Sequence, residues 1–543
     1  MAFKNCIDEM DLSTDGEPTS RFQSLISQST QICQGPLKTF LLNTVKETLD
    51  DSGMVRRWTF GEKNQSKTRT IMMMGETGTG KSTLINVMVN YILGVKYEDN
   101  IRFEIIKEEE RSQTLSQTSA ITVYEIYGNE GARVPFSLRL IDTPGYTDTS
   151  GEKQDEQISK NISKLFNAEK GVQQIDAVCL VVKASQNRLT DIQVKIFDAI
   201  LSLFGKDIEN NIMALITFSD GGKKPEALEA IDKAGVPCAR NKKKEPIFFK
   251  FNNVSKKIND DCGDEGDDDD EEDDEEDDED ENYWQRNWEM GVATMQKFFE
   301  SLDKMETRSL QMTQKVLMGR EQLEMNIQCL QDQITAAENL QIMLRQTQDV
   351  LEKHKEDIDA NKDFDYVVDE PCTIKVETRY PATCCRVCET NCHYPCTVVS
   401  ADWLNWCAVM KGKNCTVCEK KCSYEDHIKE KKMYKPSTRR VTKTFEKMKE
   451  QYGRASREKA TTEDLVKNLQ EHAENVVSGK SELVEESYRH ILSLSKIALR
   501  PDSRSTVQHL DFLLERLKET GTKEQIQKIM EIKKRAGELS KLK

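Results

Sequence analysis

The feature that most constrains this sequence is a glycine-rich stretch between an apolar run and a helix-like segment. The run 71–74 has the length of a buried strand, and apolar residues recur at helical spacing over 82–93. A phosphate-binding loop needs this context, because its backbone N–H groups and the helix N-terminus face the phosphate oxygens. We expect Lys81 to reach the β- and γ-phosphates and the Ser82 hydroxyl to bind Mg²⁺. The stretch is Gly75, Glu76, Thr77, Gly78, Thr79, Gly80, Lys81, Ser82 and Thr83.

Four later apolar runs predict further strands, as expected where parallel strands are buried on both faces. An acidic residue, Asp142, ends the first run, where it can hold Mg²⁺ through water, and the Gly145 amide that follows can sense the γ-phosphate. The runs are 136–141, 175–182, 211–216 and 246–251.

The nucleotide base is expected at the ends of the last two runs. Thr217 and Asp220 follow the run 211–216, and Asn252 and Asn253 follow 246–251. A carboxylate at Asp220 can accept two hydrogen bonds from a guanine edge, whereas adenine would leave it unpaired and desolvated. The sequence therefore predicts guanine nucleotides, and it disfavours an ATP-driven machine.

In this order and spacing, the motifs resemble those of the immunity-associated (IMAP, or AIG1-type) GTPases, relatives of septins and of chloroplast import GTPases. The resemblance covers residues 68–305. It implies an α/β, Ras-like fold of three layers with a mostly parallel sheet, GTP or GDP with Mg²⁺ as cofactors, and dimerisation across the nucleotide face.

The resemblance also implies roles for single residues. Lys81, Thr118 and Gly145 would serve catalysis, and Ser82, Thr118 and Asp142 would bind Mg²⁺. Thr118, just before a strand at 120–124, is the expected switch threonine, and Thr114 is its competitor. Asp220 would read the guanine, and Asn253 would belong to the loop around the base.

Two positions depart from the family pattern. Phe218 stands where the family usually has a basic residue, and Tyr146 stands where Ras-type enzymes have the glutamine that orients the attacking water. No histidine precedes His354. We therefore expect slow GTP hydrolysis unless a partner or a second protomer completes the site. The alternative is a non-hydrolysing zinc and coiled-coil scaffold with a structural nucleotide.

An acidic run dominates the charge of the chain. Seventeen of the eighteen residues of 264–281 are acidic, so without them the net charge of −16 becomes +1. Such a run repels itself and buries nothing, which predicts a disordered insertion in a loop near the base. It serves as a solvated spacer or, alternatively, as a dock for basic partners, and it argues against nucleic-acid binding nearby.

The start of the chain has no signal-peptide core, and no apolar stretch reaches the ~18 residues of a membrane span. With GTPase motifs, this predicts a cytoplasmic protein.

After residue 306 the pattern changes to that of a long helix. A four–three spacing over 306–362 predicts the seam of a coiled coil or a long helical hairpin, or else a helix folded back onto the GTPase domain. A coiled coil would let two copies of the chain associate; the sequence does not identify other protein partners. The seam is Leu323, Ile327, Leu330, Ile334, Ala337, Gln341, Leu344, Gln348 and Leu351.

Ten of the sixteen cysteines lie within residues 372–422. Two similar quartets with Cys-x₂-Cys pairs predict about two structural zinc ions, and a reducing compartment disfavours disulfides. Spacing leaves open whether each quartet is contiguous or the two interleave; Cys372, Cys384, Cys407 and His393 are further candidates. The quartets are Cys385, Cys388, Cys392 and Cys396, and Cys415, Cys418, Cys422 and His427.

The sequence thus predicts six regions. They are a disordered start (1–19), a helical extension (20–67), the GTPase domain (68–305), the long helix (306–362), the zinc module (363–432) and a helical bundle (433–543).

Overall fold

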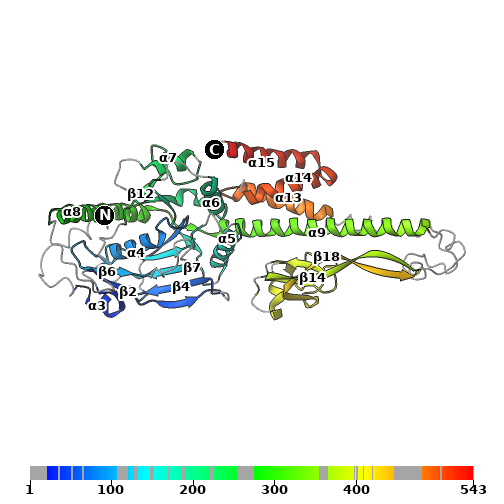
Figure 1. Ribbon diagram of the computed structural model, residues 1–543, viewed down its shortest axis with the longest axis horizontal. Helices are drawn as coiled ribbons and strands as arrows, with labels where there is room; N and C mark the ends of the chain where they lie inside the picture. Colours follow the sequence, from blue (N-terminus) through cyan, green and yellow to red (C-terminus); the bar gives the residue numbers. More distant parts are fainter. Residues whose placement is uncertain are drawn as a thin grey trace. The chain divides into compact units, whose positions relative to one another are not determined.

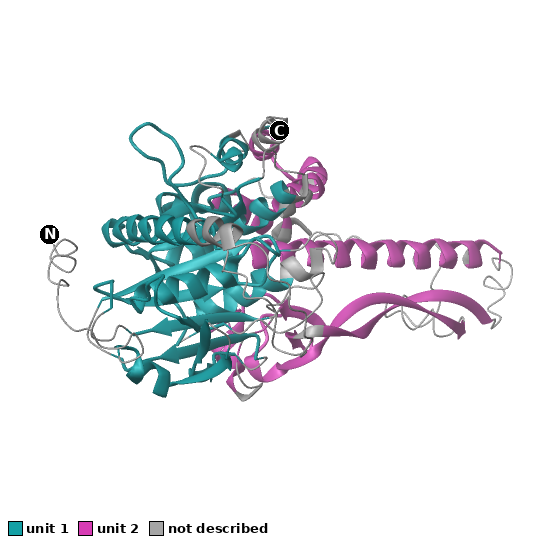
Figure 2. Cartoon of the chain, turned by 60° about the vertical axis from the view of Figure 1, so that its left-hand side comes forward, with its two compact units in different colours: residues 1–318, 494–505, 534–543 teal, residues 319–493, 506–533 magenta. Residues whose placement is uncertain are grey.

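The computed structural model divides the chain into two compact units (Figure 2). Unit 1 comprises residues 1–318, 494–505 and 534–543, and unit 2 comprises 319–493 and 506–533. The structure describes residues 21–34, 37–50, 53–63, 67–106, 120–127, 132–146, 152–168, 170–185, 191–219, 225–233, 235–253, 274–353, 365–394, 396, 398, 401–407, 409–418, 420–444, 467, 480–501 and 504–541. The predicted disordered start, 1–19, lies outside these residues.

Unit 1 is built on an eight-stranded mixed sheet (Figure 1). The five strands from β12 to β8 are parallel, β7 is antiparallel to β8, β4 is parallel to β7, and β3 is antiparallel to β4. The expected run of parallel strands is thus one part of a mixed sheet. In spatial order the strands are β12 (Phe248–Lys250), β11 (Ile212–Thr217), β10 (Ala177–Lys183), β5 (Thr68–Gly75), β8 (Ser137–Asp142), β7 (Ile121–Ile126), β4 (Val55–Phe60) and β3 (Val45–Thr48).

Helices cover both faces of this sheet. Successive side chains of a strand point to opposite faces, so Ile71 and Met73 of β5 pack with α4 and α8, whereas Met72 and Met74 pack with α5, α6 and α7. The central strand is therefore buried on both sides. The helices are α4 (Lys81–Ile92), α5 (Glu152–Asn167), α6 (Asp191–Ser202), α7 (Glu226–Lys233) and α8 (Asp274–Lys304).

The predicted helical extension at 20–67 is wrong, because this region is mostly strand. After the short helix α3 (Gln23–Ser27), β1 (Ser29–Cys33) and β2 (Lys38–Leu42) form a small sheet with β6 (Ile101–Glu104), and β3 and β4 extend the main sheet. Phe40 and Leu42 are both buried and lie two residues apart, which is the spacing of a strand.

The disorder predicted for the acidic run is wrong for its second half. Residues 264–273 lie outside the described part, but α8 begins at Asp274, so 274–281 are helical rather than disordered. The positive end of a helix dipole favours acidic residues in the first turns, and this offsets part of their mutual repulsion.

A buried ion pair joins strand β5 to the residue before β10, and its hydrogen bonds reach the chain that follows α8. Arg69 Nη1 lies 2.6 Å from Asp176 Oδ1, and the two side chains are 2% and 1% exposed. Arg69 also donates to the Met305 carbonyl at 2.9 Å, while Asp176 accepts from the Thr70 amide at 2.7 Å and the Thr307 hydroxyl at 2.7 Å. Each charge is thus paired and hydrogen-bonded, as burial requires.

Unit 2 contains most of the long helix α9 (Gln311–Lys353), packed on a two-stranded ribbon of β14 (Asp365–Cys385) and β18 (His427–Thr444). Met325 of α9 shares a buried cluster with Ala382, Cys384 and Met433 of the ribbon. Farther along, Gln346 donates to Asp369 Oδ2 at 2.9 Å. Both contacts are made by α9 residues that lie between the predicted seam positions, and a coiled coil is not confirmed.

The C-terminal region is helical only in part. The predicted bundle began at residue 433, but β18 continues to Thr444, paired throughout with β14. The helices that follow among the described residues are α13 (Lys480–Ile497), α14 (Arg504–Thr520) and α15 (Lys523–Lys541). Within the described ranges, none of the helices is long and apolar enough to cross a membrane.

We expect Arg69→Ala to lower the free energy of unfolding by about 3–5 kcal/mol, because it leaves the Asp176 carboxylate buried without its partner. Chemical denaturation followed by circular dichroism measures the change. Lys170→Ala is the matched control: its pair with Glu47, at 3.0 Å, is solvent-exposed and contributes at most about 1 kcal/mol. Equal losses in the two variants would contradict the assignment.

Candidate functional sites

The phosphate-binding loop connects β5 to α4 through conformations that favour glycine. Gly80, directly before α4, has φ of +80°. Gly75 has φ of +156°, and a Cβ there would lie 2.5 Å from the Val181 carbonyl oxygen. Gly80 therefore disfavours a side chain because of its backbone conformation, and Gly75 does so mainly because there is no space for a Cβ.

A buried ammonium and a buried carboxylate lie beneath this loop. Lys81 Nζ donates to the carbonyls of Gly75, at 3.1 Å, and Glu76, at 2.8 Å. Burial lowers the pKa of Lys81 to about 8, and the Asp142 and Glu76 charges oppose that shift. Burial raises the pKa of Asp142 to about 7 against the pull of Lys81, and its Oδ1 has no hydrogen-bond partner. Such a pair suits a site that takes an anionic phosphate and a cation.

The segment after Asp142 is attached directly to the loop. The Thr77 amide donates to the Tyr146 carbonyl at 3.0 Å, and the Tyr146 amide donates to the Gly75 carbonyl at 3.2 Å. A Cβ at Gly145 would lie 2.4 Å from the Thr77 hydroxyl oxygen. The Tyr146 side chain is fully buried. It is therefore part of the core and does not face the loop from solvent.

The end of β11 holds the other side of the loop. The Thr217 hydroxyl donates to the Thr79 carbonyl at 2.8 Å. Phe218 has φ of +53°, its side chain is 57% exposed, and its ring lies 3.7 Å from where a Gly80 Cβ would stand. The departure at Phe218 thus places an aromatic face, open to solvent, beside the phosphate loop.

Lys183 is a cation at this site that the sequence analysis missed. Its Nζ lies 5.9 Å from the centre of the Phe218 ring and 3.9 Å from where a Gly78 Cβ would stand. Lys183 ends β10, and side chains at the carboxyl ends of parallel strands meet at one edge of the sheet. Its position directly after a predicted strand is the feature of the sequence that could have identified it.

The structure describes only some of the remaining residues that were predicted to bind the nucleotide. The Ser219 amide donates to the Phe251 carbonyl at 3.1 Å, so the ends of β11 and β12 adjoin. Asn252 Nδ2 donates to Asn287 Oδ1 of α8 at 3.1 Å, and Asn253 is half-buried. Asp220, Thr118 and its competitor Thr114 lie outside the described residues.

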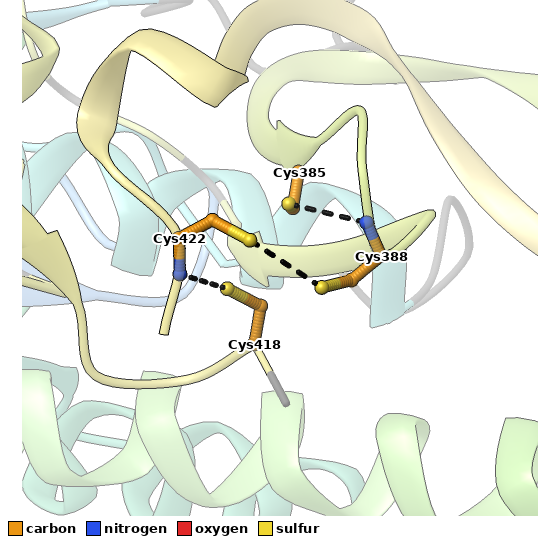
Figure 3. Close-up of side chains that lie close together, drawn as sticks. All are labelled: Cys385, Cys388, Cys418 and Cys422. Atoms are coloured by element: carbon orange, nitrogen blue, oxygen red, sulfur yellow. Dashed lines mark hydrogen bonds between the residues drawn. The ribbon is translucent and has the colours of Figure 1, made fainter. Parts of the chain in front are cut away.

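The cysteine-rich region brings its ligands together as interleaved groups. The first contains Cys385, Cys388, Cys418 and Cys422, whose sulfur atoms lie within 4.8 Å of one another (Figure 3). Cys388 Sγ and Cys422 Sγ are 3.6 Å apart. The Cys388 amide donates to Cys385 Sγ and the Cys422 amide to Cys418 Sγ, both at 3.3 Å. Such N–H···S bonds stabilise thiolates that hold a metal.

The second group contains Cys392, Cys415, Cys418 and His427. His427 is 5% exposed; its Nδ1 lies 2.7 Å from the Ser423 carbonyl, and its Nε2 has no partner. Nδ1 therefore donates, which leaves the Nε2 lone pair for a metal. Cys418 belongs to both groups, so the predicted quartets interleave.

Cys396 belongs to neither of these groups, contrary to its predicted place in the first quartet. It lies with His393 and Cys407 in a third group. Cys384, one residue before Cys385, points the other way into the cluster with α9, where burial raises its pKa to about 12. The described cysteines are all free thiols.

Besides β14 and β18, the elements of this cysteine-rich region are short. They are β15 (Thr390–His393), η2 (Ala401–Trp406), β16 (Met410–Lys411), β17 (Asn414–Cys415) and η3 (Tyr424–Asp426). Cysteines make up most of the buried cluster in this region, with Val409 as its one buried aliphatic member among the described residues. So few buried apolar residues provide little of the apolar burial that stabilises a fold without metal.

Comparison with known proteins assigns a family to the segment that contains the phosphate-binding loop. Residues 69–233 match the model of the AIG1 family, so this segment is an AIG1-family domain, which confirms the predicted resemblance to IMAP-type GTPases. No curated protein matches the chain.

Several solved structures are similar to part of the chain. Toc33 from Arabidopsis thaliana with Mg²⁺ and GMPPNP is 16% identical, with 45% of this chain and 88% of that chain covered and a TM-score of 0.27. A dimerization-deficient mutant of Toc33 from the same plant is also 16% identical, with coverage of 44% and 83% and a TM-score of 0.27.

We expect Gly145→Ala to destabilise the GTPase domain by about 1–3 kcal/mol, because the added Cβ would overlap Thr77 and push the segment 142–146 off the phosphate loop. Differential scanning fluorimetry and denaturant titration measure the loss. In Gly291→Ala, the control in α8, a Cβ meets nothing within 4 Å, and alanine adds up to about 1 kcal/mol of helix stability. Wild-type stability of Gly145→Ala would disprove the close contact.

Proposed function

We propose that this protein binds GTP with Mg²⁺ and acts as a slow GTPase whose nucleotide state controls its interactions. The observation that carries the proposal is the buried pair of Lys81 and Asp142 beneath a loop shaped by Gly75 and Gly80. In this arrangement Lys81 contacts the β- and γ-phosphates, Ser82 and Asp142 hold Mg²⁺, and the Gly145 amide senses the γ-phosphate.

Guanine recognition rests on the end of β11. We assign the base to the open face of Phe218, with Asp220 accepting hydrogen bonds from the guanine edge and Asn253 in the surrounding loop. Lys183 adds a positive charge beside the phosphate loop, where it offsets the loss of the basic residue at position 218.

Slow hydrolysis follows from Tyr146. A buried tyrosine whose backbone is bonded to Thr77 and Gly75 leaves no glutamine-like group at this position to orient water. Pairing of two GTP-bound domains across Thr118 and the 142–146 segment would supply the missing groups in trans. Such a contribution is worth about 10³–10⁵ in rate in related reactions.

A second candidate function is a non-hydrolysing scaffold with a structural nucleotide, which the buried Tyr146 also favours. Measuring GTP turnover distinguishes the GTPase from the scaffold, because a scaffold retains GTP or GDP without converting it at any protein concentration.

The metal groups have a structural role in this proposal. Cys385, Cys388, Cys418 and Cys422 bind one zinc ion, and Cys392, Cys415, Cys418 and His427 bind a second. Cys418 then bridges the two ions, so both depend on one thiolate.

The first prediction of this function concerns nucleotide identity. Lys81→Ala should abolish triphosphate binding. Asp220→Ala should reduce the preference for GTP over ATP about 10²-fold or more, because hydrogen bonds to charged groups contribute about 1.5–3 kcal/mol each. Calorimetric titration of purified protein with GTP and ATP measures both. Lys96→Ala, on an exposed side chain just past α4, should leave both affinities unchanged. Equal affinity of the wild-type protein for GTP and ATP would refute the guanine assignment.

The second prediction concerns turnover. Specific GTPase activity should rise with protein concentration, in parallel with the mass measured by light scattering in GTP but not in GDP. The reason is that a lone protomer lacks the groups that pairing supplies. Fast hydrolysis by a monomer, independent of concentration, would refute the dimer mechanism, and its complete absence at every concentration would favour the scaffold.

A further inference from the structure

A third group of metal-type ligands lies beside the two zinc sites assigned above. His393 Nδ1 is 3.2 Å from Cys407 Sγ, and Cys396 Sγ is 3.9 Å from the same sulfur. The three ligand atoms lie within 4.8 Å of one another, and both thiols are buried. None of these residues belongs to either of the other groups, so the cluster is a separate site.

Strand geometry explains why His393 and the adjacent Cys392 belong to different groups. Cys392 and His393 are consecutive residues of β15, and consecutive side chains of a strand point to opposite faces. Cys392 therefore joins the second group, while His393 faces the thiols of Cys396 and Cys407.

The other two ligands are held by backbone hydrogen bonds. The Cys396 amide donates to the Pro381 carbonyl at 2.8 Å, and the Cys407 amide donates to the Leu404 carbonyl at 3.0 Å. The Thr383 hydroxyl lies 3.5 Å from Cys407 Sγ, as an outer partner of that sulfur. Three ligands are thus brought to one point from β15, the chain after it and the end of η2.

We propose that His393, Cys396 and Cys407 bind a third zinc ion. Two thiolates and an imidazole suit zinc, and the described residues supply three of the four ligands of a tetrahedral ion, which leaves a position for water. A disulfide is the chemical rival. The Cys396 and Cys407 sulfurs are 3.9 Å apart, however, whereas a disulfide needs about 2.05 Å, and His393 has no role in one.

The third ion would fix the segment between Cys396 and Cys407. That segment includes η2, where Trp403 and Trp406 are 60% and 75% exposed and Leu404 is buried. Coordination of Cys407 ties η2 to β14 and β15, and so holds two exposed tryptophans in place. The third ion would therefore order the surface around η2, a role that the two other ions do not have.

Elemental analysis of the purified full chain tests the proposal by zinc stoichiometry. We expect three zinc ions per chain in the wild type and two in Cys407→Ser and in His393→Ala. Cys372→Ser is the matched control, because Cys372 lies on the ribbon outside all three groups, and it should retain three. Two ions in the wild type, with no loss in Cys407→Ser, would overturn the third site but leave the two-ion proposal intact; no zinc at all would overturn both.

Two further measurements guard against variants that simply fail to fold. Zinc X-ray absorption of the wild type should show a larger share of nitrogen and oxygen ligands than two ions bound by the first two groups alone can give. Limited proteolysis between Cys396 and Cys407 should be faster in His393→Ala than in Cys372→Ser. Mass spectrometry showing a Cys396–Cys407 disulfide in the zinc-loaded protein would overturn the assignment.

Discussion

The nucleotide site depends on the close approach of three backbone segments. The phosphate loop, the segment 142–146 and the end of β11 meet where Gly145 leaves no space beside Thr77 and where the Thr217 hydroxyl bonds to Thr79. These contacts hold the loop in place through the protein's own groups. Because a preorganised loop spends no binding energy on its own ordering, it suits tight and selective binding of phosphate.

The same close packing sets the limits of the chemistry. Burial gives Lys81 and Asp142 their shifted pKa values, and it also places Tyr146 in the core. A site built this way suits a phosphate and a cation, but the residue after Gly145 is a buried tyrosine rather than a glutamine that orients water. The proposal of slow turnover that depends on assembly rests on this packing and on the residue after Gly145.

In the cysteine-rich module, cysteine side chains take the place of an apolar core. Its buried cluster consists mostly of thiols, and such a small module could not bury enough apolar surface to fold by itself. Ligand pairing there follows strand alternation rather than order in the sequence. This is why Cys392 and His393, or Cys384 and Cys385, serve different clusters although they are adjacent.

The sequence by itself determined the phosphate loop, the strands of the parallel part of the sheet and the presence of zinc-type ligands, because each depends on local spacing. It did not determine the strands of 20–67, where short apolar runs fit either helix or strand, nor the ribbon of β14 and β18, whose charged strands are stabilised by α9. The partners of Cys418 and Cys396 were decided only by tertiary structure. Those contacts join residues from separate elements, and no local pattern encodes which elements will meet.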